Sequence, residues 1–297
     1  MTITTEEAYE RLLGEPGVVF LLGGIDSGKT TFALELARRA VDAGIGVALV
    51  DADIAQSTIG PPTTVGLKLF RGPDPVAPAP AGADALGFVG SLSPKGHLLG
   101  LVVNTGKLVS RARKEEVPLI LVDTGGLVSG IYAQGLKYYK MDLVQPDYIA
   151  AFERGGELEP LVGVAQRFTS AEVLQVEVPR GVMPRTIEER VTLREERFAA
   201  YFAGGVSRWR VKPTVFMPTL PVGFDLALLD HLVVGMEDGS GSCVGIGVLE
   251  YDAGEDFLRM VSPVSEGVRG LRLGSIRIDI DGRSRGPVDL RHLFGSE

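Results

Sequence analysis

Cysteine is nearly absent from this sequence, because its 297 residues include only Cys243. A lone cysteine excludes an internal disulfide, which favours a reducing compartment and predicts a cytoplasmic protein. Long apolar runs are absent as well, since stretches such as Val18–Leu22 and Leu98–Val103 are far shorter than the roughly 20 residues of a membrane-spanning helix. The amino terminus has no apolar signal-peptide segment. We therefore expect a soluble protein with no membrane partner.

Positive charge is also in short supply. The chain has 30 Lys+Arg against 38 Asp+Glu, a formal net charge of −8, which argues against a protein that coats nucleic acid by neutralising many phosphates. A local basic groove remains compatible with this balance. Hydrophobic residues make up 45% and charged residues 23% of the chain, so wholesale disorder is excluded. The length allows one large domain or two unequal ones.

The first two thirds of the chain alternate short apolar runs with helical patterns. Buried strands are expected at 18–22, 47–50, 86–90, 119–122, 148–152 and 172–178. Helices are expected at 29–43 with Gly44 after the last turn, from a Ser93–Pro94 cap to 114, around 135 and 161, and from the capping box Thr186–Glu189 to 202. A proline-rich loop is expected at 71–84, with Pro73, Pro75, Pro78 and Pro80. This alternation predicts the α/β class, with a doubly wound parallel sheet.

The pattern changes near Trp209, where short strands broken by glycine turns begin. Residues 275–281 alternate apolar and polar side chains, which is typical of a half-buried strand. We therefore predict a smaller, all-β C-terminal domain, with boundaries at 1–205 and 206–297.

The strongest motif follows the first buried strand and opens the first helix. Gly23-Gly-Ile-Asp-Ser-Gly-Lys-Thr30 fits the P-loop pattern GxxxxGK[ST]. Backbone N–H groups of such a loop bind phosphates, its lysine reaches the β- and γ-phosphates, and its threonine binds Mg²⁺. The expected nucleotide contacts are Gly23, Gly24, Ile25, Asp26, Ser27, Gly28, Lys29, Thr30 and Thr31. The fold class is accordingly that of a P-loop NTPase, with ATP and Mg²⁺ as cofactors.

Acidic residues follow two of the predicted strands. Asp51 and Asp53 come after the second strand, and Asp123 follows the apolar run 119–122 in a Walker-B-like position. Ligands of open α/β sheets bind at the carboxyl ends of the strands, so these carboxylates are expected near the P-loop. Thr30, Asp51, Asp53 and Asp123 are the candidate metal ligands, and one carboxylate could orient or deprotonate an attacking hydroxyl. The alternative is that they cap loops.

The helix after Thr186 carries Arg190, Arg194 and Arg197 on one face, at i, i+4 and i+7. A solvated charged face, offset by neighbouring glutamates, is one interpretation. The other is an arginine lid that closes over a transferring phosphate and stabilises its charge.

Other candidates carry weaker signals. His97 is expected to form local hydrogen bonds rather than bind a metal, because no second His or Cys lies at ligand spacing. Tyr138 and Tyr139, flanked by Lys137 and Lys140, could stack on and neutralise nucleic acid, although packing is the more ordinary role. No Asn-Lys-x-Asp guanine motif is present.

Taken in order, these motifs resemble the polynucleotide 5′-hydroxyl kinase family, which includes the kinase subunit of the messenger-RNA cleavage factor and the kinase of ribosomal-RNA processing. The resemblance runs from Gly23 to Phe202. It comprises the P-loop with its acidic Asp26, the stretch from Asp51 to Pro62 that reads Asp-x-Asp-x-x-Gln and then Ser-Thr-Ile-Gly-Pro-Pro, the Thr-x-Gly of residues 124–126, and the later arginines. The resemblance implies an ATP-dependent kinase that acts on the 5′-hydroxyl end of RNA or DNA.

The resemblance also implies roles for single residues. Lys29 and Asp53 would be catalytic, with Asp53 near Mg²⁺ and the incoming hydroxyl, Gln56 beside it and Asp51 in support. Thr124, Gly125 and Gly126 would form the clasp, a segment that packs over the P-loop lysine and restrains it. Arg190 and Arg194 would be the lid arginines.

Three departures from the family pattern are visible. Ala55 replaces the usual glycine before the glutamine, Leu127 stands where eukaryotic members often have tryptophan, and the P-loop strand starts near Val18, which implies a compact prokaryotic-type member. Two other functions stay open: a non-catalytic ATP-binding scaffold of RNA processing, and a P-loop GTPase of the metal-insertion or maturation type. Positive charge nevertheless gathers near the lid, at Arg180, Arg185, Arg190, Arg194 and Arg197. An enzyme that needs only the end of a strand can be acidic overall.

Overall fold

The computed structural model of the chain describes residues 2–72, 75–178, 181 and 183–295. Pro73 of the expected loop and Arg180 of the expected basic group lie outside these residues. Within the described part of the chain, no helix is both long enough and apolar enough to span a membrane.

The core sheet runs in the strand order β1-β8-β7-β2-β6-β3-β4-β5. Neighbours from β1 to β3 are parallel, whereas β4 pairs antiparallel with both β3 and β5. The bounds are β1 Thr2–Ile3, β2 Val18–Gly23, β3 Val47–Ala52, β4 Thr64–Phe70, β5 Ala85–Phe88, β6 Leu119–Thr124, β7 Tyr148–Glu153 and β8 Glu172–Glu177. The expected α/β fold is confirmed, although its sheet is mixed rather than wholly parallel.

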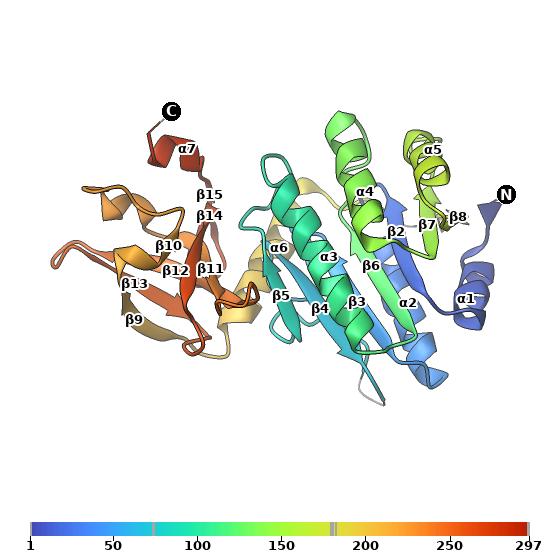
Figure 1. Cartoon of the computed structure of the whole chain (residues 1–297), viewed down its shortest axis with the longest axis horizontal. Helices are drawn as coiled ribbons and strands as arrows, with labels where there is room; N and C mark the ends of the chain where they lie inside the picture. The colour runs from blue at the N-terminus through green and yellow to red at the C-terminus, as the bar shows by residue number, and fades with distance from the viewer. Residues whose placement is uncertain (1, 73–74, 179–180, 182, 296–297) are drawn as a thin grey trace.

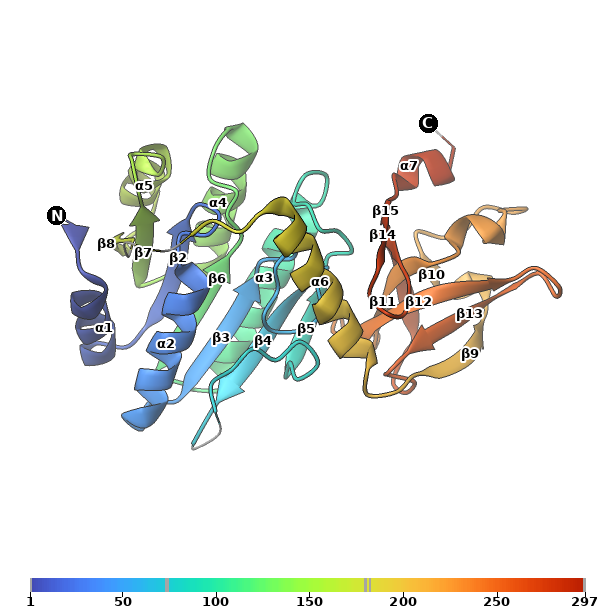
Figure 2. The same ribbon diagram turned by 180° about the vertical axis from the view of Figure 1, so that it is seen from behind.

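Helices cover both faces of this sheet. They are α1 Thr5–Gly14 and α2 Lys29–Asp42 on one face, and α3 Leu98–Lys114, α4 Ile131–Val144 and α5 Glu159–Phe168 on the other. Side chains of β2 alternate between the two layers, because Val19 and Leu21 pack with α1 and α2 while Val18 and Phe20 pack with α3, α4 and α5. Figure 1 shows α3 to α5 on the near side of the sheet, and Figure 2, seen from the opposite side, shows α1 and α2 on the face turned to the viewer. This arrangement is the doubly wound one.

Helix α6 (Ile187–Phe202) leads from the core sheet to the remaining strands. Thr186 caps it with the expected capping box, since the hydroxyl accepts from the Glu189 N–H and the Glu189 side chain accepts from the Thr186 N–H. Its first turns lie over the carboxyl ends of the core strands (Figure 2). Its last turn packs into an apolar cluster with Phe88 of β5 and Ile246.

The remaining strands form the β-rich C-terminal part. They are β9 Ser207–Val211, β10 Phe216–Met217, β11 Leu232–Glu237, β12 Cys243–Asp252, β13 Phe257–Ser262, β14 Gly270–Ile278 and β15 Ser284–Pro287, with the 3₁₀ turns η1 Pro213–Val215 and η2 Leu226–Leu229 and the short helix α7 Leu290–Leu293. They have a core of their own. Among the described residues, one register pair, Leu86 with Cys243, connects β5 to β12.

Three elements differ from the sequence expectation. Helix α3 begins at Leu98 rather than at the Ser93–Pro94 cap, because these residues form local turns and His97 takes the N-cap position. Strand β4 was not expected, since Gly66 and Lys68 interrupt its apolar pattern. Helix α1, with its capping box at Thr4, was missed as well.

Candidate functional site

The P-loop lies between β2 and α2, at the carboxyl edge of the sheet. Asp26 and Gly28 adopt φ of 52° and 89°, so the loop uses the left-handed region. A Cβ at Gly23 would lie 2.5 Å from Ser27 Oγ, which leaves room for no side chain there. Lys29 Nζ donates to Gly24 O at 2.6 Å and Ser27 Oγ at 3.2 Å. The ammonium is thus turned onto its own loop, and burial lowers the pKa of Lys29.

Thr30 and Asp123 provide oxygen donors beside the loop. Thr30 Oγ1 donates to Asp123 Oδ2 at 2.5 Å. Asp123 Oδ1 is buried and has no hydrogen-bond partner among the described residues, and burial raises the pKa of this carboxyl. A carboxylate oxygen without a hydrogen bond, next to the hydroxyl of a P-loop threonine, offers oxygen ligands of the kind that Mg²⁺ prefers. The residues present therefore fit the implied metal, although no cluster of three or more His, Cys, Asp or Glu side chains suited to a metal occurs in the described chain.

Asp51 and Asp53 have different surroundings. Asp51 Oδ2 accepts from the N–H of Thr58, from Thr58 Oγ1 at 2.7 Å and from Ile59 N at 3.1 Å, while Oδ1 accepts from Asp53 N at 3.0 Å. Burial, with the nearby Asp123 charge, raises the pKa of Asp51 to about 7. Because both oxygens accept hydrogen bonds from its own loop, the geometry favours a loop anchor, and the role of Asp51 as a metal ligand stays a prediction.

Asp53, by contrast, lines the cavity. Its Oδ1 accepts from the N–H groups of Ala55 and Gln56, each at 3.0 Å, whereas its Oδ2 has no hydrogen bond within the described residues. The alanine at 55 still supplies the N–H that the turn needs. Asp53 thus lies near the P-loop, with Oδ1 held by two N–H groups of its turn and Oδ2 able to accept a hydrogen bond from a ligand.

The lid arginines line the same cavity as the P-loop. Arg194 Nε and Arg197 Nη1 are buried and have no hydrogen-bond partner among the described residues. Burial lowers the pKa of both guanidinium groups. A buried N–H donor without a hydrogen-bond partner is costly, so these two nitrogens favour an anionic ligand in the cavity.

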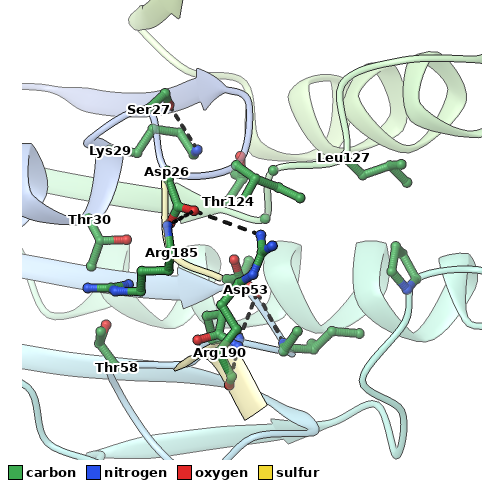
Figure 3. A pocket seen from close by; sticks show the side chains of 18 of the residues that line it. Asp26, Ser27, Lys29, Thr30, Asp53, Thr58, Thr124, Leu127, Arg185 and Arg190 are labelled. Atoms are coloured by element: carbon green, nitrogen blue, oxygen red, sulfur yellow. Dashed lines mark hydrogen bonds and ion pairs between the residues drawn. The ribbon is translucent and has the colours of Figure 1, made fainter. Parts of the chain in front are cut away.

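Arg190, one turn earlier, connects the lid to two other segments. Its Nη1 lies 3.8 Å from Asp26 Oδ2, and its carbonyl accepts from Gln56 Nε2 at 3.1 Å. The N–H of Arg185 also donates to Asp26, at 3.0 Å. Figure 3 shows Asp26 between Arg185 and Arg190, opposite Asp53. The P-loop, the Asp53 turn and the lid thus meet at Asp26 and Gln56.

The segment Thr124–Gly126 packs against β2 and the P-loop residue Ile25, and its restraint of Lys29 stays a prediction. Thr124 Oγ1 donates to Leu21 O at 2.7 Å. A Cβ at Gly126 would lie 2.5 Å from Ile25 N, so glycine is required for this approach. Leu127, next to the clasp, lines the cavity.

Several residues of the cavity were not expected from the sequence. Lys137 and Lys140 are each 1% exposed, so they cannot act as outward-facing cations beside the exposed Tyr139, and that possible role is corrected. Arg154 Nη2 donates to Asp26 O at 2.7 Å. His97 Nε2 lies 3.2 Å from Ser275 Oγ of β14, which is 178 positions away in the sequence, so the side-chain hydrogen bond is long-range and not the local one expected. Lysine burial leaves no signal in sequence periodicity, because lysine is normally exposed.

The cavity has a volume of about 810 Å³, which is within the range of ligand sites. Beyond the P-loop, clasp and lid, its wall includes the apolar side chains Leu92, Pro94 and Leu101.

Comparisons with known proteins support one family. The model of the family described as mRNA cleavage and polyadenylation factor CLP1 P-loop matches residues 23–204. A polyribonucleotide 5′-hydroxyl-kinase of Thermococcus kodakarensis is 29% identical, over 92% of this chain and 91% of its own length. One of Pyrococcus furiosus is 28% identical, over 97% and 96%. A CLP1 homologue of Culex quinquefasciatus is 27% identical, over 79% and 55%.

A solved structure of Clp1p in complex with Pcf11p shares the fold. It superposes with a TM-score of 0.73 at 13% identity, over 92% of this chain and 78% of that chain. Because α6 ends at Phe202 of 297 residues, a match that covers 92% of the chain includes C-terminal strands as well as the core sheet.

Proposed function

We propose, because this chain belongs to the CLP1 P-loop family, that it is an ATP-dependent kinase that transfers the γ-phosphate of ATP to the 5′-hydroxyl end of RNA or DNA. The observation that carries the proposal is the pair of buried, partnerless guanidinium nitrogens of Arg194 and Arg197, in the cavity that the P-loop lines. A phosphoryl group in transfer carries negative charge, and its oxygens would supply the hydrogen-bond acceptors that these two nitrogens lack. Relatives in two archaea are named polyribonucleotide 5′-hydroxyl-kinases.

Each group has a part in the proposed reaction. The acceptor 5′-oxygen attacks the γ-phosphorus, the bond from that phosphorus to the β–γ bridging oxygen breaks, and ADP leaves. Asp53, with its Oδ1 fixed by two N–H groups, orients the hydroxyl through Oδ2 and receives its proton. Lys29 exchanges its bonds to Gly24 O and Ser27 Oγ for phosphate oxygens. Arg190, Arg194 and Arg197 stabilise the transferring charge.

The implied Mg²⁺ fits beside Thr30 and Asp123, where it would neutralise phosphate charge and fix the phosphate geometry. Asp51 contributes indirectly, because its four hydrogen bonds hold the 53–59 turn from which Asp53 projects.

The test is transfer of radiolabelled phosphate from γ-labelled ATP to RNA and DNA oligonucleotides with a 5′-hydroxyl. We expect labelled product that disappears when the acceptor already carries a 5′-phosphate. Lys29→Ala should lower transfer by at least about 100-fold, as loss of a charge-stabilising group does. Transfer by the wild-type protein no greater than by Lys29→Ala would sink the proposal.

The same assay separates the two rivals. Tight ATP binding without transfer to any acceptor, together with co-purifying proteins, would favour the ATP-binding scaffold. Selective GTP hydrolysis that is independent of an acceptor hydroxyl would favour the GTPase.

We also propose that the division at 205/206 separates a kinase part from a C-terminal part. The support is the separate apolar core of the later strands and the single register pair between β5 and β12 in the described residues.

A further inference from the structure

Helix α4 carries two buried lysines that the proposed reaction does not use. Lys137 and Lys140 are three residues apart, so they share the face of α4 that packs under the sheet edge. Each is 1% exposed, and both line the cavity. Their neighbours on this helix, Leu136 and Met141, are ordinary core residues. Because burying a lysine is far costlier than burying leucine or methionine, packing alone does not account for the pair.

Lys137 is held by hydrogen bonds. Its Nζ donates to Thr124 Oγ1 at 2.6 Å and to Gly125 O at 2.8 Å. Thr124 Oγ1 uses its own proton to donate to Leu21 O, so it has a lone pair for the lysine. Helix α4 thereby holds two consecutive clasp residues, Thr124 and Gly125, through Lys137. These bonds keep the clasp next to the P-loop.

Lys140 is surrounded differently. Its Nζ has one long contact, 3.4 Å to Ala52 O, and no carboxylate hydrogen bond among the described residues. The charges that act on it come from Asp53, Asp51 and Asp123. Asp51 of β3 and Asp123 of β6 are register partners on adjacent parallel strands, and Asp53 follows β3 directly. Lys140 therefore interacts with the carboxylates mainly through its charge rather than through a fixed bond.

We propose that Lys137 and Lys140 are positioning residues with separate tasks, in which Lys137 fixes the clasp by hydrogen bonds and Lys140 balances the charge of the three carboxylates. The inference rests on the proposed function only in that ATP is the ligand of the cavity. It has a consequence for nucleotide binding. Without Lys140, the carboxylates repel the triphosphate more strongly, but they also attract a divalent cation more strongly. Binding of ATP then becomes more dependent on the metal.

The experiment measures binding of a fluorescent ATP analogue, once with EDTA and once with Mg²⁺. For Lys140→Met we expect metal-free binding to weaken about tenfold, in keeping with loss of one unit charge a few ångströms away. Binding with Mg²⁺ should change by less than about threefold, because the two effects offset each other. The quantity compared is the ratio of the dissociation constant with EDTA to that with Mg²⁺. Lys140→Arg keeps the charge and should retain the wild-type value of this ratio.

Lys137→Met is the contrasting variant. Loss of the clasp bonds should weaken binding by the same factor with and without Mg²⁺, so the ratio stays at the wild-type value. Lys114→Met is the matched control, because it removes the same charge from an exposed position at the end of α3. It should leave both constants unchanged.

The outcomes are decisive for the charge-balance role. An unchanged ratio in folded Lys140→Met would overturn it, as would a ratio that changes equally in Lys137→Met. If Lys140→Met does not fold, Lys140→Gln takes its place in the same measurement, because it also removes the charge but keeps a donor for Ala52 O. A shift toward metal-dependent binding in Lys140→Gln supports the proposal, and a wild-type ratio refutes it. A wild-type protein that binds no ATP would instead refute the proposed function.

Discussion

The two halves of α6 have opposite surroundings, although they belong to one continuous helix. The first half, residues 187–197, carries Arg190, Arg194 and Arg197 over the nucleotide cavity, where two buried nitrogens lack partners within the described chain. The second half buries Phe198 and Phe202 between β5 and the C-terminal strands. The first half keeps two buried donor atoms without a partner among the described residues, and no such side-chain atom occurs in the described residues 198–202.

The contrast indicates where stability and function lie in this helix. Tyr201, in the second half, has a buried hydroxyl, but that hydroxyl accepts from Ile246 N at 3.0 Å. Glu195 Oε1 also accepts from Ser284 N at 2.9 Å, which attaches the middle of α6 to β15. The C-terminal strands thus hold the helix in place, and unsatisfied donors are confined to the end that faces the cavity. The C-terminal part therefore acts as the support of the lid.

The largest expected effect comes from removing the apolar anchor. Phe198 is 1% exposed, so Phe198→Ala leaves a cavity and should lower the free energy of unfolding by about 3–5 kcal/mol. Urea denaturation monitored by circular dichroism measures this change. Turnover per folded molecule should fall far less than it does when a lid arginine is removed.

Glu196→Ala is the control for that variant, because Glu196 is an exposed neighbour on the same helix. Its unfolding free energy should stay within about 0.5 kcal/mol of the wild-type value. If Phe198→Ala proved as stable as Glu196→Ala, the second half of α6 would not be the anchor.

A change in the first half should have the reverse effect. Arg194→Ala removes a charge-stabilising donor from the cavity, and we expect kcat to fall by about 10²–10³-fold, or about 2.7–4 kcal/mol in the activation free energy. The stability of the protein without nucleotide should be unchanged or higher, since the substitution removes a buried Nε donor that has no partner among the described residues. Steady-state kinetics and thermal melting of the same preparation measure both quantities.

Arg194→Lys distinguishes geometry from charge. It keeps the positive charge but loses the planar guanidinium fork, so it should recover only part of the activity. Full activity of Arg194→Ala would show that the first half of α6 is a solvated face and not a lid.

A smaller effect is expected where α6 meets the Asp53 turn. Gln56 Nε2 donates to Arg190 O at 3.1 Å, and Gln56→Ala removes this bond. We expect kcat to fall by about fivefold, which corresponds to about 1 kcal/mol, the usual contribution of one hydrogen bond. The KM for ATP should change little, because Gln56 holds the lid rather than the P-loop. A KM effect larger than the kcat effect would contradict this role.

Local patterns in the sequence predicted the parts of the site that short segments determine. The P-loop and the Thr186–Glu189 capping box depend on neighbouring residues, so both could be predicted. The anchoring contacts of Asp51 could not be predicted, because its partners Thr58 and Ile59 become its neighbours only when the turn folds.

The buried lysines of α4 lay beyond sequence reasoning for a different reason. Their burial depends on how α4 packs beneath β3 and β6, and Lys137 and Lys140 flank exposed Tyr139 in a way that is typical of a surface. The lack of hydrogen-bond partners for Arg194 Nε and Arg197 Nη1 among the described residues also depends on the tertiary structure. Sequence spacing gives their common face, but only the fold shows that the face covers the cavity.

The smallest expected effect tests whether the second half of α6 is as well satisfied as its contacts indicate. Tyr201→Phe removes the hydroxyl that accepts from Ile246 N, and at neutral pH it should lower the free energy of unfolding by about 1 kcal/mol. Burial raises the pKa of Tyr201 to about 12, above the value of about 10 in an unfolded chain. The folded state therefore holds the phenolic proton more tightly, and this contribution is complete below about pH 10 and is lost as the pH rises toward 12. The stability difference between wild type and Tyr201→Phe, followed by urea denaturation from neutral pH to above pH 10, should consequently shrink as the pH rises. A difference that stayed constant or grew over that interval would mean that the hydroxyl is not buried, and the contrast between the two halves of α6 would lose its polar evidence.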